Sequence, residues 1–301
     1  MKYQSGGAFR RALEERLRAQ SLQSGVPLVR LRKMVAFDRY LARLLFIQPS
    51  VWVIKGGLAM QLRLGDRART TKDIDILALS RPGEITRQLR DAGSLDLDDW
   101  FTFEVSEPAQ NAVTDHLYLR YWRRQGGLRH PIHALLDGRT FEHFHIDIGI
   151  GDPMVEAVEY FDTLALLEFA ELAPTHVPCF PITQQIAEKL HAYTRPRKSG
   201  ESSRVKDFVD MLLLSEMGTV SGERLFQAIQ ATFSARATHA CPVSVPPPPL
   251  KWESEFKRMS KDVGMDNLSL ALAYGLIQQF LDPILKEEIP GKWDAVAKSW
   301  R

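Results

Sequence analysis

The sequence predicts an α+β protein, with a mixed β-sheet and flanking helices in its first part and a helical C-terminal domain. Between about residues 50 and 150, runs rich in aromatic and β-branched residues indicate strands. Beyond residue 180 the apolar residues recur at helical spacing. The 301 residues, 45% of them hydrophobic, are enough for one large or two modest domains. We expect a sheet domain over residues 1–178 and a helical domain over residues 179–301.

The sheet domain is predicted to begin with helices and to continue mainly with strands. Apolar residues recur at helical spacing over 8–20 and 27–47, and Pro82 opens a further helix that ends near Gly93. Strands are predicted at 51–54, around Asp73 and Asp75, and at 100–105, 116–122 and 141–150. Together these elements indicate one mixed sheet with helices around it.

The C-terminal domain is predicted from four helical segments, 180–195, 203–217, 223–234 and 268–287. Residues 241–250, CPVSVPPPPL, are too rich in proline for a helix or a central strand, so we expect a rigid extended connector there. Residues 195–204 are basic and contain Ser and Gly, which indicates a loop.

The stretch KGGLAMQLRLGDRARTTKDIDI, residues 55–76, carries most of the functional signal. On a strand, Asp73 and Asp75 project from one face and the intervening isoleucines from the other. Adjacent carboxylates repel each other, and Mg²⁺ relieves that repulsion, because it is usually held by one or two carboxylates together with substrate phosphates. The pair therefore predicts a metal-dependent phosphate site, although a half-buried edge strand with a solvated face has the same pattern.

A glycine turn precedes this pair. The strand predicted at 51–54 leads into Gly56-Gly57 and then into the apolar run LAMQLRL, which indicates a strand, a turn and a helix in succession. Free backbone N–H groups at such a helix start can receive a phosphate.

A third candidate carboxylate is Asp147, in the strand predicted at 141–150. If that strand lies beside the first pair, Asp73, Asp75 and Asp147 can converge on one or two metal ions, the arrangement that polymerases use. A surface Asp at a strand end gives the same sequence pattern.

Composition excludes several classes of protein. Two cysteines, Cys179 and Cys241, are too few for a disulfide framework or a cysteine-based zinc site, and they fit a reducing cytoplasm. The N-terminus has no apolar signal segment, and no run of about 18 apolar residues occurs, so neither secretion nor membrane association is expected. We expect a cytoplasmic protein.

The charge is distributed unevenly along the chain. The net charge is +2, yet residues 1–72 contain 15 Lys and Arg against 4 Asp and Glu. Basic surroundings beside an acidic pocket are expected if the pocket holds metal and the surroundings hold a polyanion, while solvated Arg-rich helices are the alternative. The candidates for tracking an RNA backbone are Arg63, Arg67, Arg69, Lys72, Arg123, Arg124, Arg129 and Arg139, with Tyr121 or Trp122 for stacking.

Four motifs occur in an order that resembles a known family: KGGLAMQLRLGDRARTTKDIDI, HIDIGIGD, IAEKLHAYTR and RVKDFVD. They resemble the AbiEii/MenT-type nucleotidyltransferase toxins of bacterial type IV toxin–antitoxin systems, over about residues 50–215. The resemblance implies a DNA-polymerase-β-like fold and an enzyme that transfers nucleotides from NTP to RNA, notably to the tRNA 3′ acceptor end, and so inhibits growth. It also implies Mg²⁺ or Mn²⁺ as cofactor and a cognate antitoxin that acts directly or indirectly.

The resemblance assigns roles to individual residues. The resemblance implies that Asp73, Asp75 and Asp147 are metal ligands. It also implies the catalytic residues Asp73, Asp75, Lys189, Asp207 and Asp210. Lys189 could neutralise triphosphate charge as a point cation. The two helix carboxylates, at positions i and i+3, could act together on a base, a ribose hydroxyl or that lysine.

Nucleotide-binding residues are expected around the glycine turn. The wider superfamily has Gly-Ser where this chain has Gly56-Gly57, so one hydroxyl ligand is missing, and a threonine before the carboxylates or backbone N–H groups could replace it. The expected set is Gly56, Gly57, Arg69, Thr70, Thr71, Lys72 and Arg204. His145 and His191 receive no role, because a histidine beside a core stripe is more often structural.

Three other functions fit parts of the pattern. A small-molecule nucleotidyltransferase of the aminoglycoside type would use the same carboxylates but would not need a basic surface. A non-catalytic module that binds RNA or a partner would not need every carboxylate. A D-x-D glycosyltransferase fits poorly with a glycine turn placed before the carboxylates.

Overall fold

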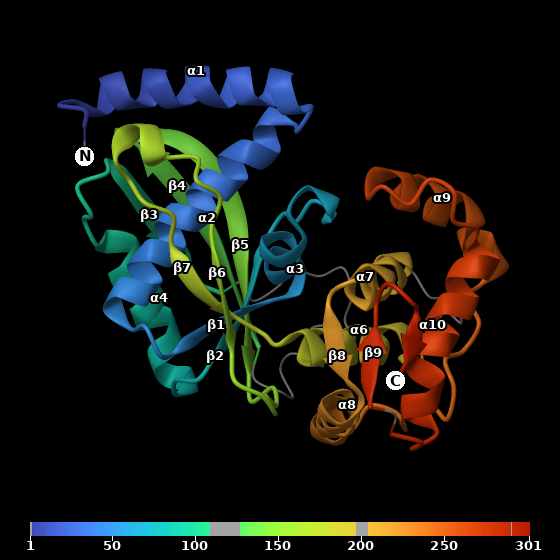
Figure 1. The fold of residues 1–301 in the computed structure, drawn as a ribbon. Coiled ribbons are helices and arrows are strands. Elements are labelled where there is room, and N and C mark those ends of the chain that lie inside the picture. The colour runs from blue at the N-terminus through green and yellow to red at the C-terminus, as the bar shows by residue number, and fades with distance from the viewer. Residues whose placement is uncertain (1, 109–126, 197–203, 290) are drawn as a thin grey trace. The chain divides into compact units, whose positions relative to one another are not determined.

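The computed structural model describes residues 2–108, 127–196, 204–289 and 291–301. The chain forms two compact units, drawn in Figure 1. The first contains Met1–Arg63, Thr70–Gly151 and Glu159–Cys179, and the second contains Leu64–Arg69, Asp152–Val158 and Phe180–Arg301. The predicted division was consecutive, whereas two short segments from before residue 179, Leu64–Arg69 and Asp152–Val158, belong to the second unit. The strand predicted at 116–122 and most of the loop at 195–204 lie outside the described residues.

A seven-stranded mixed sheet forms the centre of the first unit, in the order β3-β4-β5-β2-β1-β7-β6. Its strands are β1 Trp52–Lys55, β2 Ile74–Ala78, β3 Phe101–Val105, β4 Leu128–Leu136, β5 Arg139–Ile150, β6 Glu159–Asp162 and β7 His176–Cys179. The pairs β2–β5 and β1–β7 are parallel and the other pairs are antiparallel. This sheet confirms the predicted α+β class.

The sequence analysis missed β4, which lies between β3 and β5. Pro131 argues against a central strand because it has no N–H for the ladder. The structure accommodates it where β3 ends, and there the Pro131 carbonyl accepts a hydrogen bond of 3.1 Å from the N–H of Ser106.

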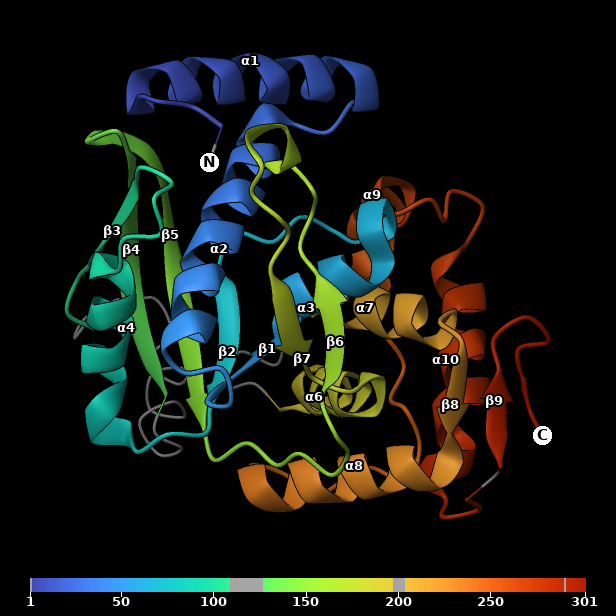
Figure 2. The ribbon, with the colours of Figure 1, turned by 60° about the vertical axis from the view of Figure 1, so that its left-hand side comes forward.

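Four helices belong largely to the first unit: α1 Gly6–Ser24, α2 Leu28–Ile47, α3 Gly56–Leu64 and α4 Ile85–Ser94. Figure 2 shows α2 crossing the sheet, with α4 beside it and α1 across its end. Aromatic rings fill the layer between α2 and the sheet: Phe37 packs edge-on against Phe144 at 5.0 Å, and Tyr40 against Phe103 at 5.1 Å. The helix side of the sheet is therefore apolar, which leaves the alternate strand positions for polar chemistry.

A buried ion pair fixes α2 to the segment before β3. The Arg43 guanidinium is fully buried and donates to both Asp99 carboxylate oxygens, at 2.9 and 2.5 Å, and to the Phe101 carbonyl at 2.8 Å. Such a fork-to-fork pair holds one geometry. It gives α2 a fixed place against the sheet.

The second unit is mainly helical, as predicted. Its helices are α6 Ile182–Thr194, α7 Val205–Ser215, α8 Gly222–Arg236, α9 Glu253–Asp262 and α10 Leu270–Leu285. Helix α9 and a three-stranded sheet of β8 Thr219–Ser221, β9 Lys292–Asp294 and β10 Ser299–Trp300 were not predicted. These strands have only two or three residues, too few for sequence periodicity to reveal them. Strand β9 is anchored by Trp293, whose indole N–H donates to the Ser215 carbonyl at 2.7 Å.

The proline-rich segment 241–249 forms neither helix nor strand, in agreement with the predicted connector. Two tyrosine hydroxyls hold it in place: Tyr193 donates to the Pro246 carbonyl at 2.6 Å and Tyr274 to the Val245 carbonyl at 3.0 Å. In the part of the chain that the structure describes, no helix is both long and apolar enough to cross a bilayer.

Candidate active site

The predicted site residues form two groups, one in each unit. The first unit holds Asp73, Asp75, Asp147, Gly56, Gly57, Thr70, Thr71 and Lys72, and the second holds Arg69, Lys189, Arg204, Asp207 and Asp210. Each group is described within its own unit.

A row of four charged residues crosses the sheet at the predicted metal site. Asp75 on β2 is in register with Asp147 on β5, with Lys55 on β1 beside Asp75 and Arg129 on β4 beside Asp147. Residues in register share a face and lie close together. The order of charges is therefore plus, minus, minus, plus across four neighbouring strands.

Asp147 lies in the middle of this row and is buried, with 7% of its surface exposed. Burial, and after it the neighbouring Asp75 and Asp73 carboxylates, raise the pKa of its carboxyl to about 7, against the opposing effect of Arg129 and Lys55. Desolvation and like charge both disfavour the ionised form. The two carboxylates in register thus create a demand for positive charge that the flanking cations meet only in part.

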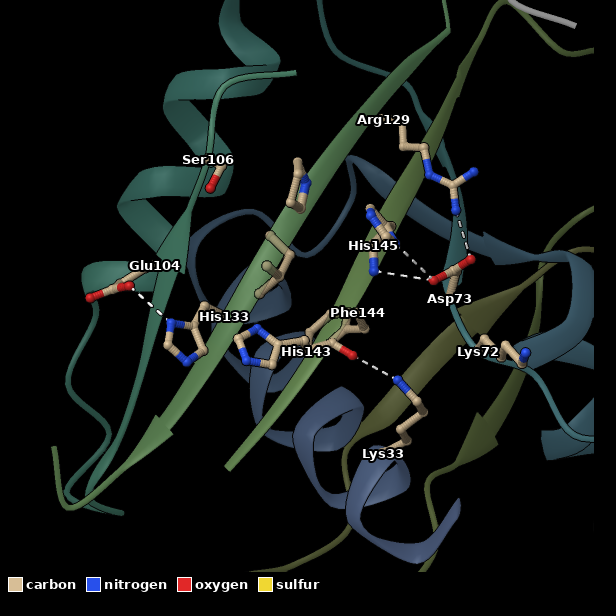
Figure 3. A pocket seen from close by; sticks show the side chains of 12 residues that line it. Lys33, Lys72, Asp73, Glu104, Ser106, Arg129, His133, His143, Phe144 and His145 are labelled. Carbon is tan, nitrogen blue, oxygen red and sulfur yellow. Dashed lines mark hydrogen bonds and ion pairs between the residues drawn. The ribbon is translucent and has the colours of Figure 1, made fainter. Parts of the chain in front are cut away.

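Asp73 differs from the prediction in its position. Strand β2 begins at Ile74, so Asp73 belongs to the bend directly before the strand and not to the strand itself. One of its carboxylate oxygens accepts from Arg129 Nη2 at 2.8 Å (Figure 3). The other accepts from the backbone N–H of His145 at 3.2 Å and lies 3.3 Å from His145 Nδ1. Asp73 is therefore held by β4 and β5.

The donor set fits a divalent cation through two of the three predicted ligands. Among the described residues, no three His, Cys, Asp or Glu side chains form a ready metal-binding group. Asp75 and Asp147 nevertheless supply two adjacent carboxylates, which is the number Mg²⁺ commonly takes from a protein when phosphates complete its shell. Asp73 pairs with the same Arg129 as Asp147 and acts electrostatically on the Asp147 carboxyl, so it remains a proposed third ligand.

The glycine turn is shaped around Asp75. Gly56 has φ +61, and a Cβ atom there would lie 2.1 Å from Asp75 Oδ2, so only glycine fits. The Gly57 N–H donates to the same oxygen at 3.4 Å. The start of α3 therefore faces a negative charge, and helix starts favour anions of either kind, carboxylate or phosphate.

The threonines and the lysine before β2 have different environments. Thr71 is buried, and its hydroxyl donates to the Asp73 carbonyl at 3.0 Å, which stabilises the bend that carries Asp73. Thr70 and Lys72 are exposed. Thr71 thus already uses its hydroxyl proton within the protein.

In the second unit, Asp210 joins two cations. Its carboxylate is fully buried, lies 2.7 Å from Lys189 Nζ, and accepts from Arg69 Nε and Nη2, both at 2.9 Å. Burial acts to raise the pKa of Asp210, but Lys189 and Arg69 outweigh it and hold that pKa below its usual range. Burial likewise acts to lower the pKa of Lys189, and Asp210 and Asp207 reverse this and raise it. Both groups are therefore charged at neutral pH.

Asp207 lies one helical turn before Asp210 and extends the network. It accepts from Lys189 Nζ and from Arg204 Nη1, each at 3.3 Å. The four predicted residues of α6 and α7 are thus brought together, and Arg69, expected to bind nucleotide, pairs with Asp210.

Several predicted RNA-contacting residues have partners within their own unit. Arg63 pairs with Glu159 at 2.5 Å and lies over the Phe161 ring, and Arg67 pairs with Glu216. The candidates Tyr121, Trp122, Arg123 and Arg124 lie outside the described residues.

Sequence reasoning missed Lys55 and the contact of His145 with Asp73. The only sign of Lys55 in the sequence was its position directly before the glycine turn. Its place beside Asp75 depends on the pairing of β1 with β2, which the sequence does not show. His191, to which no role was given, is buried, and burial lowers its pKa to about 3; its Nε2 lies 2.8 Å from the Thr238 hydroxyl. That environment is structural.

Comparisons with known proteins agree with the fold and the motifs. Residues 39–299 match the family described as nucleotidyl transferase AbiEii toxin, type IV TA system. The solved structure of MenT4, nucleotidyltransferase toxin Rv2826c from Mycobacterium tuberculosis H37Rv, is similar with a TM-score of 0.53 and 15% identity, covering 90% of this chain and 97% of that one. A putative nucleotidyltransferase from H. pylori gives a TM-score of 0.43 and 14% identity, over 85% and 96% of the two chains. A comparison with curated proteins finds no match.

The family match covers more than half of the chain, and the similarity to MenT4 shows the nucleotidyltransferase fold. Both confirm the interpretation of the four sequence motifs. The chain is a nucleotidyltransferase and belongs to the AbiEii toxin family of type IV toxin–antitoxin systems.

Proposed function

We propose that the protein is a metal-dependent toxin that transfers nucleotides from an NTP to RNA, with the tRNA 3′ acceptor end as acceptor, and so blocks translation and growth. The observation that carries the proposal is the in-register pair of Asp75 and Asp147, flanked by Lys55 and Arg129. It is a site for a cation and a phosphate, and the glycine turn begins directly beside it.

In the proposed reaction the 3′-hydroxyl oxygen of the acceptor bonds to the α-phosphorus, the bond from that phosphorus to the bridging oxygen breaks, and pyrophosphate leaves. The hydroxyl proton passes to water. Charge accumulates on phosphoryl oxygens, so cationic and N–H groups must already be in place.

The residues of the first unit have separate parts in this reaction. Asp75 and Asp147 would hold Mg²⁺, or Mn²⁺, which when bound neutralises phosphoryl charge. The N–H groups at the start of α3 would hold phosphate oxygens beside Gly56 and Gly57. Lys55 and Arg129 limit the charge at the two ends of the carboxylate pair.

We also propose that Lys189 takes part in the reaction, as the family motif implies. Asp210 and Asp207 keep this lysine charged and oriented. Thr70, Thr71, Lys72 and Arg204 remain proposed nucleotide-binding residues, and an antitoxin remains a proposed partner.

The test is incubation of the protein and Mg²⁺ with each α-labelled NTP in turn and total tRNA. Wild type is expected to label RNA with the preferred NTP, and Asp75→Asn and Lys189→Met are expected to reduce labelling at least about 100-fold, since each removes charge from a phosphoryl-transfer site. Asp162→Asn, a carboxylate of the distant edge strand β6, is the matched control and should label as wild type does.

The outcomes separate the candidate functions. Label in a small molecule but not in RNA would favour an aminoglycoside-type enzyme, and RNA binding without any labelling would favour a binding module. Full labelling by Asp75→Asn would contradict the proposed site.

A further inference from the structure

A cavity of about 650 Å³ opens beside Asp73 in the first unit. It is drawn in Figure 3, and its basic and imidazole lining consists of Lys33, Lys72, Arg129, His133, His143 and His145. Of these six residues, only Arg129 and Lys72 have a part in the function proposed above.

The cavity follows one face of the β4–β5 ladder. Three rungs of that ladder are in register, Arg129 with Asp147, Pro131 with His145, and His133 with His143. Alternate residues of a strand share a face, so the three rungs form one continuous path. At about 3.3 Å per residue, the path runs about 13 Å from Asp147 to His143.

The far end of the path is an aromatic platform. The rings of His133 and His143 stack with centroids 4.1 Å apart and planes 15° apart. His133 is fixed from both sides, with Nδ1 3.1 Å from Glu104 and Nε2 3.1 Å from the Thr140 hydroxyl. His143 is exposed, so its ring is accessible for a further stacking partner.

Cations line the path between this platform and the carboxylates. Lys33 Nζ donates to the His143 carbonyl at 2.7 Å and lies 3.4 Å from Glu142, so its charge lies at the platform and is shared with that carboxylate. Lys72 is exposed, and Arg129 lies at the other end, between Asp73 and Asp147. An exposed ring next to separated cations suits a strand of nucleic acid, which offers bases for stacking and phosphates for charge.

The in-line geometry of the reaction indicates whether the NTP or the acceptor strand lies in this cavity. Attacking and leaving oxygens lie roughly in line on opposite sides of the phosphorus. The glycine turn follows Lys55 at one end of the charged row, and the cavity begins at Arg129 at the other end. If the pyrophosphate leaves toward the turn, the acceptor hydroxyl arrives from the cavity.

We propose that this cavity is the acceptor-strand subsite, in which the end of a single-stranded RNA lies along β4 and β5 and stacks a base on His143. The proposal rests on the proposed function and extends it by naming where the acceptor is held. His143 is thus a specificity-determining residue some distance from the reacting atoms.

The test measures RNA and NTP binding separately. A 5′-labelled single-stranded RNA decanucleotide is titrated by fluorescence anisotropy, and the NTP preferred in the labelling assay is titrated calorimetrically without RNA. For His143→Ala we expect RNA affinity about 5- to 150-fold weaker, the range for loss of one stacked base, with NTP affinity and melting temperature unchanged. His143→Phe keeps the ring and should retain RNA binding. Lys33→Gln should weaken RNA binding and lower its salt dependence by about one phosphate contact.

His176→Ala is the matched control, because His176 is also an exposed histidine stacked on a ring, that of Tyr160, and lies on β7. It should bind RNA as wild type does. Unchanged RNA affinity in His143→Ala, an equal loss in His176→Ala, or a loss of NTP affinity instead would overturn the subsite. If wild type itself neither binds nor labels RNA, the proposed function fails as well, so the two failures are distinct.

Discussion

At the scale of single residues, the site is governed by two carboxylates that strand pairing forces together. Asp75 and Asp147 cannot separate without breaking the β2–β5 register, so their repulsion is built into the sheet. Gly56 permits this arrangement because no side chain can stand between the turn and Asp75. Both features are measurable by substitution and by titration.

Gly56→Ala is expected to abolish nucleotide transfer and to lower stability. The new Cβ would combine a left-handed backbone conformation, which costs about 1–2 kcal/mol, with displacement of the Asp75 carboxylate. Gly65→Ala is the control, because Gly65 has nearly the same φ, +60, and nothing within 4 Å. RNA labelling and thermal unfolding of both variants check this. If both variants lost activity equally, backbone strain alone would explain the loss and the contact with Asp75 would not matter.

The raised pKa of Asp147 predicts that the metal-free protein loses stability as pH rises. Burial and the neighbouring carboxylates raise that pKa from 3.8 to about 7, so the folded state keeps a proton that the unfolded state has released. The stability contribution of this group is complete below about pH 4 and falls as pH approaches 7. Asp147→Asn should flatten that slope, which thermal unfolding from pH 4 to 8 in a chelator would show. A slope unchanged by the substitution would contradict the assignment.

At the scale of elements, Asp210 is the point at which α6, α7 and the segment before β2 meet. Asp210→Asn leaves Lys189 and Arg69 without their buried anion, and breaking such a pair costs about 3–5 kcal/mol. We expect a matching fall in the free energy of unfolding by urea denaturation. Asp162→Asn, at an exposed position, should change it by no more than about 0.5 kcal/mol; an equally small effect of Asp210→Asn would contradict the role of the pair.

Elements also show where sequence reasoning succeeds and where it ends. Periodicity located β5 and Asp147 because alternation marks a half-buried strand. It could not find β4, since Pro131 is allowed only by the early end of β3, nor the pairing of Asp73 with Arg129, because register is a property of two strands together. The motif residues of α6 and α7 were identified, whereas the bidentate contact of Arg69 with Asp210 joins positions 141 residues apart.

At the scale of the whole molecule, RNA binding is expected to weaken steeply with salt. If Lys33, Lys72 and Arg129 each neutralise one phosphate of a single strand, the slope of log affinity against log salt is about −2. Anisotropy titrations from about 50 to 200 mM KCl measure it. A flat response would mean that charge on the first unit does not hold RNA.

The whole-molecule architecture was predictable only in its class. The change from strand to helix patterns near residue 180 is visible in the sequence, but Leu64–Arg69 and Asp152–Val158 carry no local sign that they belong to the second unit. Their membership depends on partners more than 80 residues away, Asp210 for Arg69 and Arg236 for Asp152.

The chain passes between its two units at 63–64, 69–70, 151–152, 158–159 and 179–180. During synthesis, Arg69 leaves the ribosome long before Asp210 exists, so the segment just before Asp73 and Asp75 stays without its anchor until α7 has been made. A chain that ends before α7 therefore cannot form the Arg69–Asp210 pair, so this contact is made only after every strand of the first unit's sheet has been synthesised.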